Sequence, residues 1–258
     1  MKSYTSIILI ACAGLIWSCT KKIDLVAPTS STDGFAFLKI VHASPGFRQV
    51  VNNRDSFNVY ANDVKLNGSF LTYTAMFPTI SNLYAAVPSG TSTIRITVNG
   101  VNTPDSITLA TFTKIMSAGS YYSFILTDSL LNTNESKQIF IQDKFAITDT
   151  THFTIRFVHA LLNDSTGKNV DIYSTRQAAN LFSNVSPGAV STFTSQPYYY
   201  VNDTLIVRRA GSLFELARLS TVNVPLARQR AFTLVYRGIP SVISSGVKGR
   251  NLVPYVNQ

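Results

Sequence analysis

Hydrophobic and polar residues alternate along many short segments of the chain. In Thr93–Val98 the aliphatic side chains would face one side, and the Thr and Arg side chains the other. A period of two residues is typical of a β-strand with one buried face. Turn-forming residues bound such segments, as Pro88-Ser89-Gly90 does here, and Asn62-Asp63 has the position of a hairpin turn. Short strands at regular spacing predict an all-β chain built from β-sandwiches.

Five of these segments occur twice in the same order, which indicates an internal repeat. The offset between paired segments stays between 107 and 117 residues, as insertions in loops would produce. We therefore predict two tandem immunoglobulin-like β-sandwich domains, residues 35–146 and 152–258. The paired segments are Phe37–Ala43 with Thr154–Ala160, Phe57–Tyr60 with Val170–Tyr173, Ser92–Gly100 with Asp203–Gly211, Leu109-Ala110 with Leu216-Ala217, and Ser123–Leu126 with Phe232–Val235.

The N-terminal residues have the pattern of an export signal. Lys2 precedes the apolar run Ile7–Trp17, which is shorter than the roughly 20 residues of a membrane-spanning helix. Ile16-Trp17-Ser18-Cys19 resembles a bacterial lipobox, and the resemblance implies cleavage before Cys19 and a lipid on its sulfur. The alternatives are a soluble secreted protein and a buried N-terminal strand or helix. We predict a signal peptide over residues 1–18, then lipidated Cys19 and a flexible tether over residues 19–34.

Cysteine usage agrees with lipidation. Of the two cysteines, Cys12 would leave with the signal, and Cys19 alone cannot close an internal disulfide. Two or three acyl chains hold a protein stably on a membrane. We therefore expect a lipoprotein of the cell envelope, anchored in the outer membrane through Cys19. Lys21-Lys22 after Cys19 does not decide whether the protein lies on the periplasmic or the surface face of the membrane. Because the protein is expected to be exported, we predict no nucleic-acid partner.

A further resemblance concerns the first repeat. Val41-His42-Ala43-Ser44-Pro45, Asn58-Val59-Tyr60 and Val87-Pro88-Ser89-Gly90-Thr91 resemble the hallmarks of the bacterial domain-of-unknown-function family 4397. The resemblance implies an extracytoplasmic β-sandwich, often found in lipoproteins of Bacteroidota-type bacteria, and no established activity. The second repeat departs from this pattern, because Leu161-Leu162 replaces Ser-Pro and Asn202-Asp203 replaces the Pro-Ser-Gly turn.

Motifs that would carry catalysis are absent from the sequence. There is no Gly-x-Ser-x-Gly, no His-Glu-x-x-His, no Walker loop and no dinucleotide-binding glycine motif. Three histidines and one mature cysteine supply few ligands for zinc, and Glu135 and Glu215 are the two glutamates. We predict a non-enzymatic protein with no catalytic residues, no metal and no cofactor.

His42 and His159 end equivalent strands of the two repeats. By alternation, His42 shares a face with Leu38 and Ile40, and His159 lies on the matching face of its own strand. Fold-defining contacts are needed once per repeat, whereas a catalytic or metal site is rarely needed twice. We therefore assign both histidines a structural role, buried and hydrogen-bonded to a neighbouring loop.

Aromatic residues and charge offer candidates for binding. Tyr198-Tyr199-Tyr200 and Tyr121-Tyr122 could form a platform for sugars, because adjacent residues on a strand point to opposite faces. Residues 35–151 contain 8 Lys/Arg and 7 acidic residues, and residues 152–258 contain 11 and 4. The basic second repeat could contact an anionic glycan, an anionic lipid or an envelope protein, or its charge could only keep the protein soluble.

One small motif recurs. Six of the eleven Asp residues precede Ser or Thr. Asp-Ser/Thr followed by an apolar residue resembles the O-glycosylation signal of Bacteroidota envelope proteins, which implies Ser106, Ser129 and Thr204 as acceptors. The alternative is that these dipeptides only start turns.

Together these features predict a membrane-anchored interaction or adhesion module. The alternative is a carbohydrate-binding accessory lipoprotein of a glycan uptake system. The oligomeric state stays open.

Overall fold

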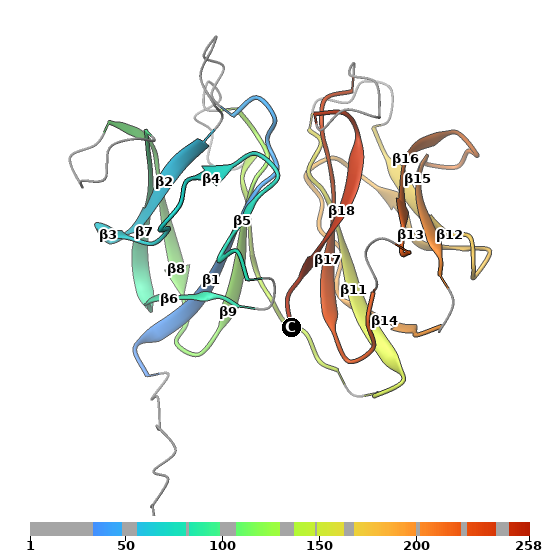
Figure 1. The fold of residues 1–258 in the computed structure, drawn as a ribbon, viewed down its shortest axis with the longest axis horizontal. Coiled ribbons are helices and arrows are strands. Elements are labelled where there is room, and N and C mark those ends of the chain that lie inside the picture. The colour runs from blue at the N-terminus through green and yellow to red at the C-terminus, as the bar shows by residue number, and fades with distance from the viewer. Residues whose placement is uncertain are drawn as a thin grey trace, which may run out of the picture. The chain divides into compact units, whose positions relative to one another are not determined.

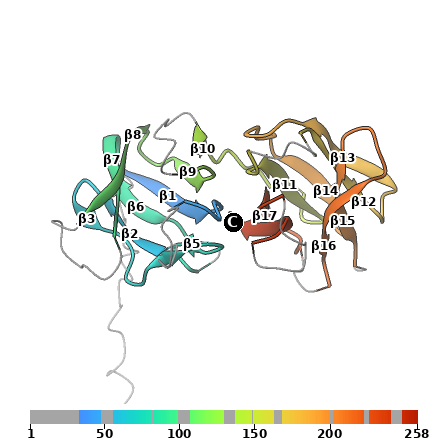
Figure 2. The same cartoon turned by 90° about the horizontal axis from the view of Figure 1, so that it is seen from above.

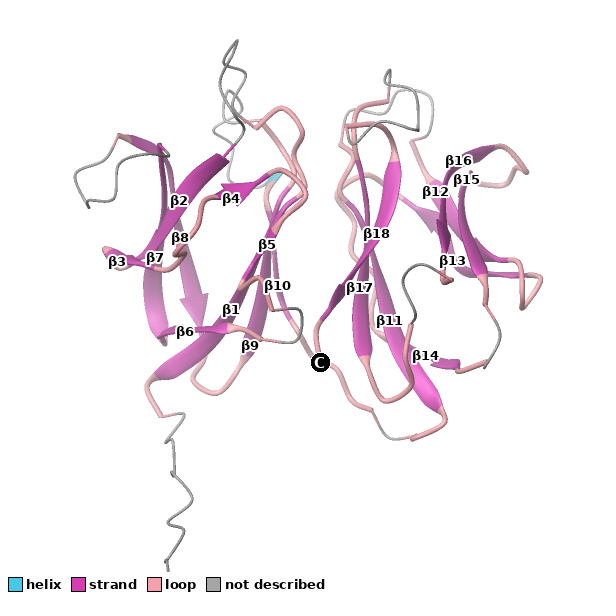
Figure 3. Ribbon diagram, in the orientation of Figure 1, coloured by secondary structure: helices cyan, strands magenta, loops and turns pink. Residues whose placement is uncertain are grey.

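The eighteen regular elements in the described part of this computed structural model are all strands (Figures 1 and 3). The structure describes residues 33–47, 56–80, 83–98, 107–129, 137–147, 149–162, 168–199, 202–222, 226–240 and 248–258. The predicted signal peptide, Cys19 and nearly all of the predicted tether lie outside these residues. The all-β prediction is confirmed.

Two sheets form the first sandwich. One has the order β10-β9-β1-β5, with β6 also paired to β1, and the other has the order β3-β2-β7-β8, with β4 paired to β2. The strands are β1 Phe35–His42, β2 Ser56–Ala61, β3 Val64–Lys65, β4 Leu71–Thr72, β5 Met76–Phe77, β6 Ala85–Pro88, β7 Gly90–Val98, β8 Thr108–Met116, β9 Tyr121–Leu126 and β10 Ile139–Gln142.

The second sandwich also consists of two sheets (Figure 2). Their orders are β14-β11-β17-β18 and β13-β12-β15-β16. The strands are β11 His152–His159, β12 Val170–Ser174, β13 Ala179–Val185, β14 Thr194–Pro197, β15 Thr204–Arg209, β16 Glu215–Ser220, β17 Ala231–Arg237 and β18 Asn251–Val256.

Both sandwiches use the same pairing scheme. Each contains one parallel pair, β1 with β9 and β11 with β17, and the other pairs are antiparallel. The hairpin predicted at Asn62-Asp63 joins β2 to β3, and both turn residues have positive φ, as a tight hairpin turn requires. The order β10-β9-β1 thus corresponds to β18-β17-β11, and β2-β7-β8 to β12-β15-β16, whereas each sheet of the first sandwich has one strand more than its counterpart.

The register of these strands corrects one of the five sequence matches. His42 of β1 lies opposite Leu126, and His159 of β11 lies opposite Tyr236, so Tyr236 is the counterpart of Leu126. The sequence comparison had paired Leu126 with Val235. Almost every residue of β9 and β17 is buried, so no hydrophobic alternation fixes their alignment to one residue.

Each sandwich has its own apolar core between its sheets. Ile94 and Ile96 of β7, predicted to face inward, are buried with Leu38 and Ile40 of β1. A second cluster contains, among others, Ile155, Phe157, Ile172, Val207 and Leu234. Burying alternate side chains of two facing sheets supplies the main favourable term for folding each sandwich.

A third apolar cluster joins the two sandwiches, which belong to one unit, Thr32–Gln258. It is made of equivalent residues from both, including Val41 with Val158, Ala43 with Ala160, and Ile125 with Val235. These side chains lie on the opposite face of β1, β9, β11 and β17 from the cores. The strands are therefore buried on both faces, which explains their continuous hydrophobic sequences.

A buried polar network lies beside this third cluster. Asp143 accepts hydrogen bonds from the hydroxyls of Tyr84 and Ser123, each at 2.7 Å, and forms an ion pair with Arg156 of the second sandwich. Arg156 donates through Nε to Thr233 Oγ1 at 2.9 Å. The Asn257 side chain donates to Tyr84 Oη at 2.9 Å. The Asp143 carboxylate thus interacts with residues of both sandwiches.

Lys39 occupies the position in β1 that Arg156 has in β11. Both side chains are 1% exposed, and the Lys39 ammonium donates to the carbonyl oxygen of Val256 and lies 4.3 Å from the Tyr84 ring centroid. Burial lowers the pKa of Lys39 from 10.5 to about 8, opposed by the attraction of Asp143 and assisted by the repulsion of Arg156. Asp143 is therefore the counter-charge for two buried cations.

Candidate functional site

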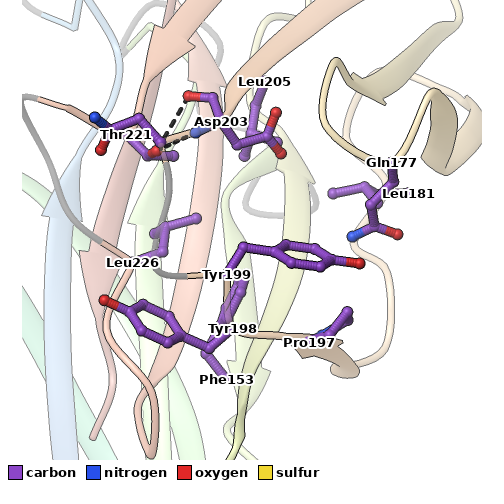
Figure 4. A pocket seen from close by; sticks show the side chains of 11 residues that line it. Phe153, Gln177, Leu181, Pro197, Tyr198, Tyr199, Asp203, Leu205, Thr221 and Leu226 are labelled. Atoms are coloured by element: carbon purple, nitrogen blue, oxygen red, sulfur yellow. Dashed lines mark hydrogen bonds between the residues drawn. The ribbon is translucent and has the colours of Figure 1, made fainter.

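A small cleft at the β12–β13 hairpin contains Tyr198 and Tyr199 of the predicted Tyr198-Tyr199-Tyr200 cluster. Figure 4 shows its side chains, which come from β11, the hairpin, the segment after β14, and β15 with its flanks. The lining residues are Phe153, Gln177, Leu181, Pro197, Tyr198, Tyr199, Asn202, Asp203, Leu205, Thr221 and Leu226. Sequence-distant segments therefore build one surface from aromatic, aliphatic and amide side chains.

Tyr199 is the most exposed aromatic residue of this cleft. Its side chain is 41% exposed, and the Arg176 guanidinium lies 5.2 Å from its ring centroid. Tyr198 is half-buried, and its backbone N–H donates to the carbonyl oxygen of Thr151 at 3.0 Å. Both tyrosines follow the end of β14 and line the same cleft, so they do not point to opposite faces as residues of a strand would. Tyr200 lies outside the described residues.

The Asp203 side chain accepts hydrogen bonds from three consecutive residues at the start of the β12–β13 hairpin. Its Oδ1 accepts hydrogen bonds from the Thr175 hydroxyl at 3.0 Å and the Arg176 backbone N–H at 2.9 Å, and its Oδ2 accepts from Ser174. Thr221 Oγ1 accepts from the Asp203 backbone N–H at 2.7 Å. Since both carboxylate oxygens are engaged in this way, Asp203 fixes the hairpin that carries Arg176 rather than serving as a base.

The size of the cleft decides how a ligand could bind. Its cavity holds about 70 Å³, whereas pockets that enclose a small molecule measure about 300–1,000 Å³. A ligand would therefore lie across the surface, stacked on Tyr199 with the Gln177 amide and the Asn202 side chain as polar neighbours. Within the described residues, no group of three or more His, Cys, Asp or Glu could hold a metal ion.

His42 and His159 are the last residues of β1 and β11. Both are 0% exposed, and His42 lies among Phe47, Phe57 and Tyr73 with ring-centroid distances of 4.9–5.7 Å. The backbone contacts of the two histidines are equivalent. His42 N–H donates to Ala75 O and His159 N–H to Ala189 O, each at 3.0 Å.

The remaining predicted sites are scattered over the chain. Thr204 begins β15 and is half-buried, and Ser129 follows buried Asp128, whose Oδ1 accepts the Ser129 backbone N–H at 2.8 Å. Ser106 and Cys19 lie outside the described residues. Tyr121 is 38% exposed and stacks on Phe37 at 4.8 Å, far along the chain from the cleft, whereas Tyr122 is buried.

Sequence reasoning missed the buried ionic network and the role of the β12–β13 hairpin. A signal for the network was present, because a cation stands in the middle of two equivalent hydrophobic strands, Lys39 in β1 and Arg156 in β11. The hairpin gave no comparable signal. Arg176 and Gln177 are ordinary turn residues, and only the fold brings them beside Tyr199.

A membrane-spanning helix would need a long apolar helical segment, and the described residues contain none. No curated protein matches this chain.

Three solved structures are similar at low identity. The module CBMbc (family CBM26) of Eubacterium rectale Amy13K, in complex with maltoheptaose, is 11% identical over 85% of this chain and 95% of that chain, with a TM-score of 0.24. A streptococcal virulence factor described by its alpha-glucan binding is 6% identical over 79% and 93%, with a TM-score of 0.23. A putative polysaccharide-binding protein (DUF1812) of Bacteroides thetaiotaomicron is 11% identical over 81% and 93%, also at 0.23. Scores this low carry no argument about ligand.

The sequence match to a family is more specific. Residues 36–163 match a family model described as "Domain of unknown function (DUF4397)". This segment contains nearly all of the first sandwich and β11 of the second. It includes Val41-His42-Ala43-Ser44-Pro45, the motif on which the resemblance rests. Residues 36–163 are thus similar to this family.

Proposed function

We propose that the protein is a cell-envelope lipoprotein, anchored in the outer membrane through Cys19, that acts as a non-enzymatic binding module. The lipobox-like sequence before Cys19 supports the anchor, and the absence of catalytic motifs from the sequence supports a binding role. The cleft at the β12–β13 hairpin supports it further, because its one carboxylate is used in holding the hairpin.

Replacing Cys19 with alanine tests the anchor. Cys19 is the only cysteine that remains after cleavage at the lipobox, so Cys19→Ala removes the sole site for the thioether-linked lipid. We expect the variant to leave the membrane fraction and the detergent phase of a Triton X-114 partition. Cys12→Ala is the matched control and should still partition with membranes. A Cys19→Ala protein that stays fully in the detergent phase would contradict the anchor.

The ligand of this module is a glycan that stacks on Tyr199. The observation that carries this assignment is the exposed Tyr199 ring. The Arg176 guanidinium lies 5.2 Å from its centroid, and Gln177 and Asn202 line the same cleft. Sugar rings present an apolar face and a rim of hydroxyls, and an aromatic face beside amide groups matches both. An envelope protein as the ligand is the other outcome of the test below.

Glycan binding is tested by affinity electrophoresis of the whole mature chain in gels that contain soluble polysaccharides. We expect Tyr199→Ala to weaken retardation about 3- to 10-fold, which corresponds to the roughly 0.5–1.5 kcal/mol of an aromatic contact. Tyr121→Ala removes a tyrosine of similar exposure from the first sandwich and should change nothing. If no polysaccharide retards the chain, or both variants lose binding equally, the Tyr199 site is wrong.

A further inference from the structure

A second hollow lies on the other side of the β12–β13 hairpin from the tyrosine cleft. It measures about 370 Å³, which is within the range of small-molecule sites. Its walls include Tyr173 of β12, Arg208 of β15, Asn180 of β13 and Leu213, which is 84% exposed. It is therefore a larger and more open space than the cleft around Tyr199.

Arg208 is the charged group in this hollow that is available to a ligand. Its guanidinium carbon lies 3.6 Å from the Tyr173 ring centroid, so the cation stacks on the ring. Among the described residues, no carboxylate or other acceptor pairs with this guanidinium. Arg95 in the first sandwich makes a useful contrast, because it lies 4.6 Å from the Tyr60 centroid but pairs with Asp63 at 3.0 Å.

Two carboxylates lie opposite Arg208 in the neighbouring strands, Asp171 in β12 and Glu215 in β16, and both are already engaged. Glu215 accepts hydrogen bonds from Arg218 Nε and Nη2, each at 2.6 Å. Asp171 Oδ1 accepts the Asn184 backbone N–H at 2.7 Å, and its Oδ2 accepts the Gly211 backbone N–H at 3.0 Å. Asp171 therefore fixes β13 at Asn184 and the turn after β15 at Gly211, which lines the hollow. A guanidinium stacked through its face keeps its N–H edge directed outward, where it can donate two parallel bonds to an oxyanion.

The two hollows share one hairpin. Gln177 and Leu181 line the tyrosine cleft, and Ala178, Ala179 and Asn180, which lie between them in sequence, line the Arg208 hollow. The same hairpin therefore contributes side chains to both hollows. Residues 152–258 as a whole contain 11 Lys/Arg and 4 acidic residues, of which Asp171 lines the hollow and Glu215 lies opposite Arg208.

We propose that Arg208, stacked on Tyr173, binds the carboxylate of an acidic polysaccharide whose neighbouring sugar stacks on Tyr199. The proposal rests on the proposed function, since it adds an anionic subsite to the same glycan-binding surface. It assigns the ligand class as a uronic-acid polysaccharide rather than a neutral one.

The test compares the binding of oligogalacturonate and of a neutral galacto-oligosaccharide of equal length to the full mature chain by calorimetry. We expect the wild type to bind the uronate more tightly, and Arg208→Gln to weaken uronate binding about tenfold or more, as expected for a charge-assisted bidentate contact. Binding of the neutral sugar should not change. Arg95→Gln removes the same charge from an Arg–Tyr stack of the first sandwich and should bind both sugars like the wild type.

Each remaining outcome points to a specific failure. Equal affinity for both sugars, or an equal loss of uronate affinity in Arg208→Gln and Arg95→Gln, would overturn the anionic subsite. The proposed function would still hold in that case if binding of the neutral sugar depended on Tyr199. Uronate binding that needs Arg208 but not Tyr199 overturns the tyrosine cleft and keeps the Arg208 site. Binding of inorganic phosphate that Arg208→Gln abolishes, with no binding of either sugar, would assign the hollow to a free oxyanion and overturn the glycan assignment.

Discussion

Asp143→Ala should lower the free energy of unfolding by about 3–5 kcal/mol, the usual cost of removing one partner of a buried ion pair. The carboxylate pairs with Arg156 and accepts hydrogen bonds from Tyr84 and Ser123. Without it, the Arg156 and Lys39 charges, each on a side chain 1% exposed, stay buried without their counter-charge. For a unit of this size, the melting temperature should fall by roughly 10 °C.

Asp63→Ala is the matched control for this prediction. Asp63 also pairs with an arginine, Arg95 at 3.0 Å, but its side chain is 81% exposed, and surface pairs contribute about 0–1 kcal/mol. Urea unfolding of the two variants beside the wild type measures both effects. A double variant, Asp143→Ala with Arg156→Met, should recover part of the loss because one buried cation goes with the carboxylate. Equal, small effects of Asp143→Ala and Asp63→Ala would show that the network contributes little.

The strands that were predicted best are those with one buried face. In β7, Ile94 lies between the more exposed Thr93 and Arg95, so the sequence alone places it in the core. The alternation ends at Thr97, which was expected on the opposite face but is 0% exposed, where the β7–β8 register shifts. The hairpin at Asn62-Asp63 was equally readable, because these residue types tolerate positive φ. In β9 and β17 this logic fails, since a strand buried on both faces carries no alternation, and the match of Leu126 to Val235 was wrong by one residue.

The contact between the sandwiches was not predicted, for a related reason. Val41, Ala43 and their counterparts Val158 and Ala160 look like ordinary strand residues, and nothing local says that their second face packs on another sandwich. From the internal repeat we also predict that a segment of residues 149–258 folds alone. The structure adds a physical condition to it, because the isolated segment would expose Arg156 without Asp143. We therefore expect such a segment to be less stable than the same sandwich in the whole chain.

The candidate site could be predicted only in part. Adjacent tyrosines gave the expectation of one exposed ring, which Tyr199 fulfils, although both tyrosines lie beyond the end of β14. The contribution of Arg176, and of Arg208 on the far side of the hairpin, depends on how β12, β13 and β15 come together in the fold. Such long-range placement has no local sequence signal, and it determines which side chains surround a ligand.

His42→Ala and His159→Ala should each lower the free energy of unfolding by about 3–5 kcal/mol, as truncating a fully buried aromatic ring usually does. Both imidazoles are 0% exposed. The His42 ring packs against three aromatic rings, of which Phe57 is the nearest at 4.9 Å, and His159 lies 5.2 Å from Tyr236. Each truncation would leave a cavity at the end of a central strand, where the surrounding sheet cannot close in.

The third histidine of the chain supplies the control. His152 lies at the start of β11 with its side chain 32% exposed, and its Nδ1 lies 2.8 Å from Asp149 Oδ2. A partly exposed pair of this kind contributes little, so His152→Ala should cost less than about 1 kcal/mol. His42→Phe and His159→Phe keep the ring and should retain more stability than the alanine variants. Calorimetric melts with and without zinc complete the test. A His-dependent rise of the melting temperature with zinc, or alanine variants as stable as His152→Ala, would replace the structural role with a binding one, because a ligand stabilises only the state that holds its site.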